Sequence, residues 1–237
     1  MKKTITALAP LVLGLMAAPS FAQQVNAYCS TNQSWCEMAA TEFTKATGVK
    51  VVQTHLGTGE ALARLKAESS NPKTDIWWGG TGDPFLAAAE QGLLEPYRPA
   101  YLKDLYDWSV RQYDMSGNMV GGFYTSFIGI GYNEEVLTKA KLPVPKCWAD
   151  LADPKYKDEV QMPDPNSSGT AYTMLATLVQ VMGEEKAFAY FKNLHKNVNQ
   201  YTKSGIAPSQ AVGRGETAVG ISFMHDLMIS KVGGFPV

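Results

Sequence analysis

The chain has 237 residues, and its 21 Lys and Arg against 22 Asp and Glu give a formal net charge of −1. With no basic stripe and no block of like charges, this composition does not favour nucleic-acid binding or a disordered tail. The length suffices for one large domain or for two compact lobes, each with its own core, and we expect two lobes.

The first 22 residues have the pattern of a secretory signal peptide. Lys2 and Lys3 precede an apolar stretch at 5–18, and Ser20-Phe21-Ala22 is a small-x-small cleavage signature. The apolar stretch is short for a membrane span. We therefore expect cleavage after Ala22 and export of a soluble chain to a compartment that permits disulfides.

Three cysteines leave one unpaired if a disulfide forms. Cys29 and Cys36 have six residues between them, wider than the C-x-x-C of redox and zinc sites, and no second Cys or His pair lies nearby. We expect a disulfide that closes this loop, with two buried thiols as the alternative. Cys147 is expected to be an unpaired packing residue.

The first part of the expected mature chain alternates strands and helices. Strands are expected at 24–29, 49–56 and 74–80, each followed by a helix: one from 35 that Gly48 ends, one at 57–69 and one at 81–92. In the third helix we expect Asp83 as the N-cap, Pro84 at the first helical position and Gly92 at the end. This alternation predicts a parallel, doubly wound α/β sheet whose strand-to-helix turns share one edge.

A second region begins near Val120. Residues 119–133 are expected to be extended and to cross between lobes, and the elements that follow predict a second α/β lobe. These are helices at 134–140, 166–182, 184–196 and 207–214, the last capped by Gly215, and strands at 159–164, 198–202 and 217–223. The chain stops at 233–237 in what we expect to be the middle of an element of a truncated chain.

The turns before the expected helices are rich in Ser, Thr and Gly. Helix N-termini attract anions through free amides and a partial positive charge, and open α/β sheets bind ligands at the carboxyl ends of their strands. Capping chemistry explains any one such turn, but five turns in two lobes favour an anion-binding cleft. They lie at 30–32, 57–59, 80–82, 167–170 and 204–205. None is a Walker A loop or a dinucleotide fingerprint, and we expect no cofactor.

His225 and Asp226 are expected to end the last apolar strand at the mouth of this cleft. An imidazole can donate to an anion, and a carboxylate can accept from two vicinal hydroxyls of a sugar or polyol. The alternative is that Asp226 caps the next helix and His225 is half exposed. Because consecutive strand residues point apart, the two should not form a catalytic pair, and no nucleophile or metal motif accompanies them. We therefore expect a binding protein and not an enzyme.

Four strings, at 37–68, 72–99, 129–137 and 147–175, resemble the substrate-binding proteins of bacterial ABC importers. The subgroup resembled includes ferric-ion-, phosphonate- and hexose-phosphate-binding members. The resemblance implies a type II periplasmic-binding-protein fold, two α/β lobes joined by β hinge strands, with lobes at 23–122 and 123–225 and the start of a return to the first lobe at 226–237. It also implies a monomer that captures a solute in the periplasm by hinge closure and delivers it to an ABC permease in the inner membrane.

The ligand expectation depends on one departure within this family. Ferric binders carry adjacent tyrosines at the end of the late second-lobe strand, whereas Ser222 to Asp226 contains none, and the His-Asp pair is similar to the hexose-phosphate-binding members. The resemblance thus implies a small anionic solute, a sugar phosphate or related organophosphate. Ferric ion, held by residues such as His55 and His225, or a phosphonate is the alternative within the family, and a secreted serine hydrolase using Ser168 or Ser222 is the alternative of another class. The expected ligand-binding residues are Thr31, Asn32, Ser34, Thr58, Thr81, Ser168, Gly169, Thr170, His225 and Asp226.

Overall fold

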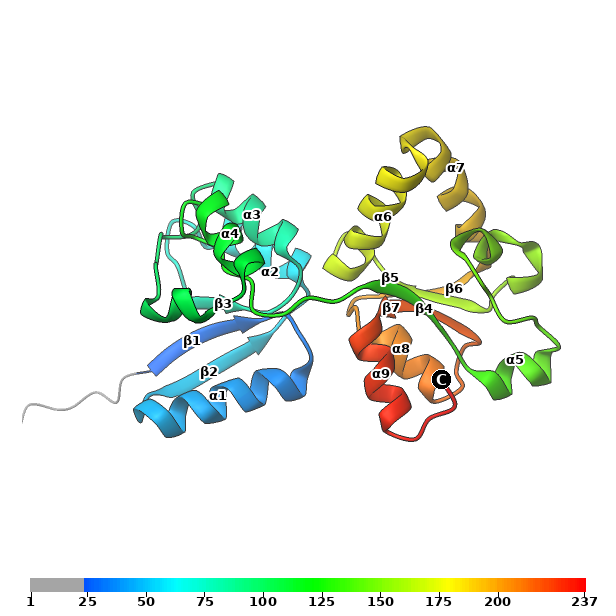
Figure 1. The fold of residues 1–237 in the computed structure, drawn as a ribbon, viewed down its shortest axis with the longest axis horizontal. Coiled ribbons are helices and arrows are strands. Elements are labelled where there is room, and N and C mark those ends of the chain that lie inside the picture. Colours follow the sequence, from blue (N-terminus) through cyan, green and yellow to red (C-terminus); the bar gives the residue numbers. More distant parts are fainter. Residues whose placement is uncertain (1–23) are drawn as a thin grey trace, which may run out of the picture.

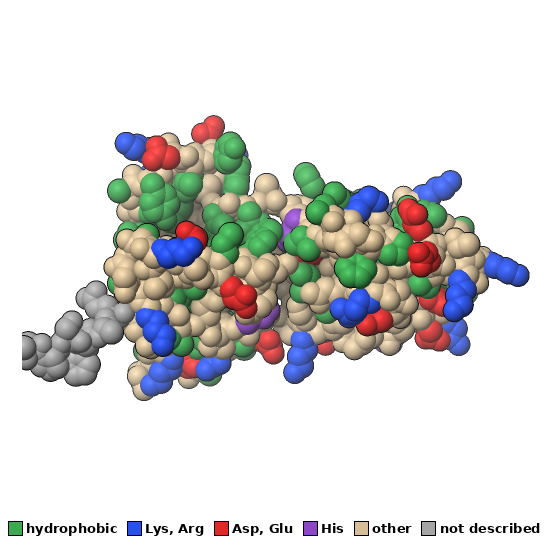
Figure 2. Space-filling model, turned by 90° about the horizontal axis from the view of Figure 1, so that it is seen from below, with side chains coloured by type: hydrophobic (Ala, Val, Ile, Leu, Met, Phe, Trp, Pro, Cys, Tyr) green, Lys and Arg blue, Asp and Glu red, His purple; other side chains and the backbone are tan. Residues whose placement is uncertain are grey.

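The structure, a computed structural model, describes residues 24–237, so the predicted signal peptide at 1–22 lies outside the described residues. Two α/β lobes lie side by side, and a single extended segment of this part of the chain passes between them (Figure 1). On the face in Figure 2, charges of both signs are interspersed and histidine side chains lie where the lobes meet. Among residues 24–237, none of the helices combines the length and the apolar character that a membrane crossing needs.

The first lobe is a parallel three-stranded sheet in the order β2-β1-β3, as the alternation predicts. Cys29, the last residue of β1, is paired with His55 at the end of β2 and with Trp78 at the end of β3. The three turns that follow these strands therefore share one edge of the sheet. The elements are β1 (Gln24–Cys29), α1 (Gln33–Thr47), β2 (Lys50–His55), α2 (Thr58–Ala67), β3 (Ile76–Trp78) and α3 (Gly82–Glu90).

Capping residues set the ends of these helices. Asn32 caps α1 by accepting from the Ser34 amide (3.1 Å), and Gly48, with φ +74°, ends it in the left-handed conformation. The expected cap of α3 is wrong: Thr81 is the N-cap and Asp83 lies inside the first turn, where its charge complements the helix dipole. The first helical residue is Gly82 and not the expected Pro84, so this expectation is wrong as well.

The rest of the first lobe comes from a stretch to which the sequence analysis assigns no element. A 3-10 helix η1 (Ala100–Asp104) and the helix α4 (Asp107–Met115) lie there. The Ser109 hydroxyl donates to the carbonyl of Gly122 and so ties α4 to the start of the segment that crosses between lobes. The small core of this lobe contains Tyr28 and Trp77, with Phe85 stacked on Trp77 at 3.8 Å between ring centroids.

The second lobe is a four-stranded sheet in the order β4-β7-β5-β6, with β4 antiparallel to β7 and the other pairs parallel. Only 128–132 of the stretch expected to be extended pairs in this sheet; residues 121–127 form the link between the lobes without a ladder of their own. The elements are β4 (Ile128–Tyr132), α5 (Glu134–Ala140), β5 (Val160–Pro163), α6 (Gly169–Met182), α7 (Glu184–Leu194), β6 (Val198–Thr202), α8 (Ala207–Gly213), β7 (Val219–Phe223) and α9 (Met224–Val232), with 3-10 helices η2 (Trp148–Ala152), η3 (Pro154–Tyr156) and η4 (His195–Asn197).

The larger core lies in this lobe. Leu151, Tyr156, Leu178 and Ile221 are at most 1% exposed, and each such apolar side chain contributes about 1.5–3 kcal/mol by its burial. Their elements hold the carboxyl ends of β5, β6 and β7 in place, on the side that faces the first lobe (Figure 1).

The last residues pack on the second lobe. Ser230 in α9 donates to the Ser209 carbonyl at 3.2 Å, and the Glu134 amide donates to the Pro236 carbonyl at 3.0 Å. Residues 233–237 are neither helix nor strand, so the expectation that they lie within an element is wrong. The helix α9 ends at Val232 because two glycines follow it. A return of the chain to the first lobe stays a prediction.

Candidate functional site

A cavity of about 220 Å³ lies between the two lobes. The turns after β1, β2 and β3 line it from the first lobe, the turns after β5 and β6 and the first turn of the helix after β7 line it from the second, and the link contributes Tyr124. All the predicted ligand-binding residues except Ser34 line this cavity: Thr31, Asn32, Thr58, Thr81, Ser168, Gly169, Thr170, His225 and Asp226. The rule that places ligands at the carboxyl ends of parallel strands thus brings them together.

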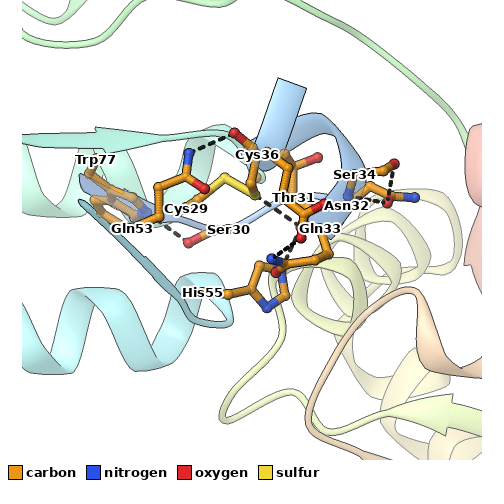
Figure 3. Close-up of a disulfide and its surroundings, with 12 residues drawn as sticks. Cys29, Ser30, Thr31, Asn32, Gln33, Ser34, Cys36, Gln53, His55 and Trp77 are labelled. Atoms are coloured by element: carbon orange, nitrogen blue, oxygen red, sulfur yellow. Dashed lines mark hydrogen bonds between the residues drawn. A yellow bond between two sulfur atoms is a disulfide. The ribbon is translucent and has the colours of Figure 1, made fainter. Parts of the chain in front are cut away.

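Ser34 shapes the loop instead. Its amide and its hydroxyl both donate to Oδ1 of Asn32, at 3.1 and 2.9 Å (Figure 3). Ser34 lies outside the cavity lining, so a direct role in ligand binding stays a prediction.

The predicted disulfide between Cys29 and Cys36 is confirmed, with 6.1 Å between the two Cα atoms (Figure 3). It joins the end of β1 to the first helical turn of α1 and so closes the loop that carries Thr31 and Asn32. Cys147 is free as predicted, but it is exposed, and the packing role expected for it is wrong. It lies at the start of the short helix η2, where Trp148 and not the cysteine packs against the core.

Two further side chains hold this loop on the first lobe. Nε2 of His55 donates to the Thr31 carbonyl at 2.7 Å, and the Trp77 indole donates to the Ser30 hydroxyl at 2.8 Å (Figure 3). A loop fixed by a covalent bond and by these hydrogen bonds has little conformational freedom left to lose when it binds a ligand.

Two threonine hydroxyls have no hydrogen-bond partner among the described residues. They are Oγ1 of Thr58 and Oγ1 of Thr81, and Thr58 is only 3% exposed. A Cβ atom placed on Gly169 would meet both hydroxyls, so they lie directly at the N-terminus of α6. A buried hydroxyl left unpaired costs about 1–3 kcal/mol, which makes this pair an unusual arrangement for a purely structural contact.

The free backbone amides of α6 lie at the same place as these two hydroxyls. The first amides of an α-helix have no intrahelical acceptor, and those of Gly169 and Thr170 find none elsewhere in residues 24–237. Together with the two threonine hydroxyls they form a set of neutral donors at the positive end of a 14-residue helix. Such a set can hold an anion without a formal positive charge.

His225 and Asp226 lie in the first turn of α9 and not at the end of a strand, so the expected strand position is wrong. The strand β7 stops at Phe223 and the helix follows without an intervening loop. As a result Nε2 of His225 approaches Oδ1 of Asp226 at 3.5 Å, which the strand geometry was expected to prevent. Nδ1 of His225 is buried without a partner in the described part of the chain.

Burial opposes charge on both members of this pair. It raises the pKa of Asp226 from 3.8 to about 7, against a smaller opposing effect of the Ser222 hydroxyl, and it lowers the pKa of His225. Trp35 of the first lobe stacks on the His225 ring with 5.3 Å between centroids. The imidazole is therefore held between the lobes and partly shielded from the solvent that would favour its protonated form.

The cavity lining also contains residues outside the predicted ligand-binding set, and Tyr124 and Lys203 are two of them. The Tyr124 hydroxyl accepts from the Gly80 amide at 3.0 Å and donates to Oγ1 of Thr31 at 3.2 Å, and so links the turns after β1 and β3. Lys203 follows β6 directly, and the strand-end rule that selected the neighbouring Ser204-Gly205 turn could have found it. Tyr124 lies in the link between α4 and β4, so the rule of turns at the carboxyl ends of strands does not select it.

The alternatives can be placed as well. Among residues 24–237, no group of three or more His, Cys, Asp or Glu side chains is arranged to hold a metal ion, although His55 and His225 both line the cavity. Ser222, one expected nucleophile of the hydrolase alternative, donates to the Gly205 carbonyl at 2.8 Å. Ser168, the other, lines the cavity at the N-cap of α6.

Comparison with known proteins gives a consistent result. Residues 71–233 match the family described as bacterial extracellular solute-binding protein. An uncharacterized protein of Haemophilus influenzae is 42% identical over 98% of this chain and 67% of its own length. Two solved structures are similar: the periplasmic binding protein P5PA (39% identity, TM-score 0.86, 90% of this chain and 68% of that chain) and AfuA of Actinobacillus pleuropneumoniae with fructose-6-phosphate bound (44% identity, TM-score 0.82, 90% and 67%). The chain thus spans about two thirds of the length of each of these three proteins.

Proposed function

Because the chain belongs to the family of bacterial extracellular solute-binding proteins, we propose that it captures a sugar phosphate or a related organophosphate between its two lobes. The similar solved proteins are named periplasmic binding proteins, which confirms the expected periplasmic location. One of them, AfuA, was solved with fructose-6-phosphate bound, and at 44% identity it supports a ligand of this class here.

The observation that carries the proposal is the set of unpaired donors at the N-terminus of α6. Phosphate oxygens accept several hydrogen bonds each, and the hydroxyls of Thr58 and Thr81 with the amides of Gly169 and Thr170 supply donors from both lobes. The helices α2 and α3 also begin at this cavity, so three helix N-termini direct partial positive charge at one volume. The phosphate binds at this end, and Lys203 adds a positive charge to the lining.

The sugar hydroxyls bind at His225 and Asp226, which also line the cavity. Asp226, at 6% exposure, accepts hydrogen bonds from two sugar hydroxyls. The unpaired Nδ1 of His225 forms a hydrogen bond with a further hydroxyl, which can donate or accept. Hydroxyl donors favour the ionised carboxylate, so ligand binding lowers the raised pKa of Asp226. The rings of Tyr124 and Phe223 provide apolar surface for the C–H face of the sugar.

Binding and closure are coupled in this proposal. The phosphate requires Thr58 and Thr81 of the first lobe and α6 of the second, so both sets of contacts exist only when the lobes are together. The closed monomer then presents the solute to an ABC permease in the inner membrane, without converting it chemically.

Isothermal titration calorimetry of the purified protein tests the proposal. Fructose 6-phosphate and glucose 6-phosphate should bind, whereas fructose and inorganic phosphate, each lacking one half of the ligand, should bind at least about tenfold more weakly. Binding of Fe(III) or of an aminophosphonate in preference to both sugar phosphates would contradict it. Turnover of a chromogenic ester that is lost in Ser168→Ala would favour the hydrolase alternative.

A further inference from the structure

The two lobes touch through their backbones at the start of α2. The amide of Gly59, in the first turn of α2, donates to the carbonyl oxygen of Ser167 at 3.1 Å. Gly59 belongs to the first lobe and Ser167 to the turn before α6 in the second lobe. This hydrogen bond therefore joins the lobes directly, beside the cavity, since Gly59 is not part of its lining.

No side chain would fit at this contact. A Cβ atom on Gly59 would lie 2.7 Å from the Asn166 carbonyl oxygen, and one on Gly57 would lie 2.5 Å from the Ser167 carbonyl oxygen. Real Cβ atoms essentially never approach a neighbour this closely, and the opposing atoms are backbone atoms that cannot rotate away. A side chain at either position would have to push the lobes apart.

The second lobe contributes a matching glycine. A Cβ atom on Gly169, the first residue of α6, would collide with the hydroxyls of Thr58 and Thr81, which belong to the first lobe. Gly169 thus lets these hydroxyls reach the N-terminus of α6, and it also lets the lobes come into contact.

The local backbone does not explain these glycines. Gly57 has φ −63° and ψ 153°, and neither Gly59 nor Gly169 has a positive φ, so other residues could adopt all three conformations. The nearby Gly80, with φ +106°, is different, since its own backbone favours glycine. Glycine is also a poorer helix former than alanine, so Gly59 lowers the stability of α2 and Gly169 lowers that of α6.

We propose that Gly57, Gly59 and Gly169 form a glycine seam that sets how closely the lobes approach each other. They are positioning residues: their lack of a side chain lets Thr58 and Thr81 reach the N-terminus of α6, where the proposed function places the phosphate. Gly59 acts on the ligand only through closure, because it does not line the cavity.

Electron–electron double resonance between spin labels on the two lobes tests the seam. Cys147 is exposed and free on the second lobe, and Lys45→Cys supplies an exposed site on α1 in the first lobe. The labelled protein is compared with its Gly59→Ala and Gly59→Leu variants. Gly82→Ala is the matched control, because it is also at the start of a helix but its Cβ would meet only the flexible Gln112 side chain of its own lobe, at 3.0 Å.

With fructose 6-phosphate, the wild type and Gly82→Ala should populate a short distance between labels. Gly59→Ala should shift that distance upward, and Gly59→Leu should show only the longer one and bind the ligand at least about tenfold more weakly. The melting temperature of the unliganded Gly59→Ala protein should not fall, because alanine favours the helix.

Failure of this inference differs from failure of the proposed function. If the wild type reaches the short distance as purified or with another solute, but fructose 6-phosphate has no effect, the ligand proposal fails and the variants still test the seam. The same distance distribution in the wild type, Gly59→Ala and Gly59→Leu, with and without ligand, would overturn the seam.

Discussion

Replacing Asp226 by Asn should make the protein more stable at alkaline pH and weaken its binding of ligand. The carboxyl group of Asp226 is buried in the first turn of α9, with His225 at 3.5 Å as its close ionisable neighbour. Asn has nearly the same shape but cannot ionise, so the substitution removes the charge and leaves the packing in place.

The size of the stability effect follows from the pKa of Asp226, which burial raises from 3.8 to about 7. Between these values the folded protein holds a proton that the unfolded chain has lost, so the contribution of Asp226 to stability falls as the pH rises through this window. At 1.36 kcal/mol per pKa unit, the full penalty above pH 7 is about 4 kcal/mol, and the part lost between pH 5 and pH 8 is about 3 kcal/mol. The lowered pKa of His225 acts in the opposite direction but is present in both proteins, so it largely cancels from their difference.

Urea unfolding at pH 5 and pH 8 measures this effect. The free energy of unfolding of Asp226→Asn, relative to the wild type, should be about 3 kcal/mol higher at pH 8 than at pH 5. Asp153→Asn is the control, since that carboxylate is exposed and its hydrogen bonds with Lys155 lower its pKa, so no gain at pH 8 is expected. Fructose 6-phosphate should bind Asp226→Asn roughly 10- to 100-fold more weakly, because neutral acceptors form weaker hydrogen bonds. Equal relative stability at the two pH values would refute the reasoning.

Three further substitutions test other parts of the account. Thr58→Val removes an unpaired buried hydroxyl, so it should weaken fructose 6-phosphate binding by about 1–3 kcal/mol in calorimetry without lowering the stability of the free protein. The exposed control Thr41→Val should change neither the affinity nor the stability, and a loss of stability in Thr58→Val with unchanged affinity would count against the phosphate site. Cys36→Ser opens the loop that the disulfide to Cys29 closes and should lower the free energy of unfolding by about 2–3 kcal/mol, a loss that reduction of the wild type should reproduce; equal urea midpoints would contradict it. Tyr124→Phe leaves a backbone amide without its acceptor and should lower the free energy of unfolding by about 1–3 kcal/mol, and an unchanged value would show that this hydroxyl does not hold the loops.

The pattern of the sequence predicts the fold where each element has its own periodicity and its own end signals. The strand at 24–29 and the helix that Gly48 ends are examples, and both appear as expected. The helix α4 was not predicted because Asp107–Met115 mixes charged and aromatic residues without a clear apolar face. The stretch 119–133 has strand-forming residues throughout, yet only 128–132 pairs, because the partner β7 lies about ninety residues away in the sequence and extends no further.

Much of the candidate site could be predicted from one rule, which places ligands at the turns that follow the carboxyl ends of parallel strands. That rule brought Thr58 and Ser168 to one cavity from opposite lobes. The rule also placed His225 and Asp226 at the cavity, but their assignment to a strand end was wrong, because α9 follows β7 without loop residues to mark the change from strand to helix. The role of Tyr124 and of Gly59 depends on how the lobes and their link are placed in space, which local sequence patterns do not encode.

A crystal structure of the protein with fructose 6-phosphate tests the central claim most directly. Phosphate oxygens should lie within hydrogen-bond distance of the Gly169 and Thr170 amides and of the Thr58 hydroxyl, with sugar hydroxyls on Asp226. A ligand held by one lobe alone, or one whose phosphate lies away from the N-terminus of α6, would contradict the account.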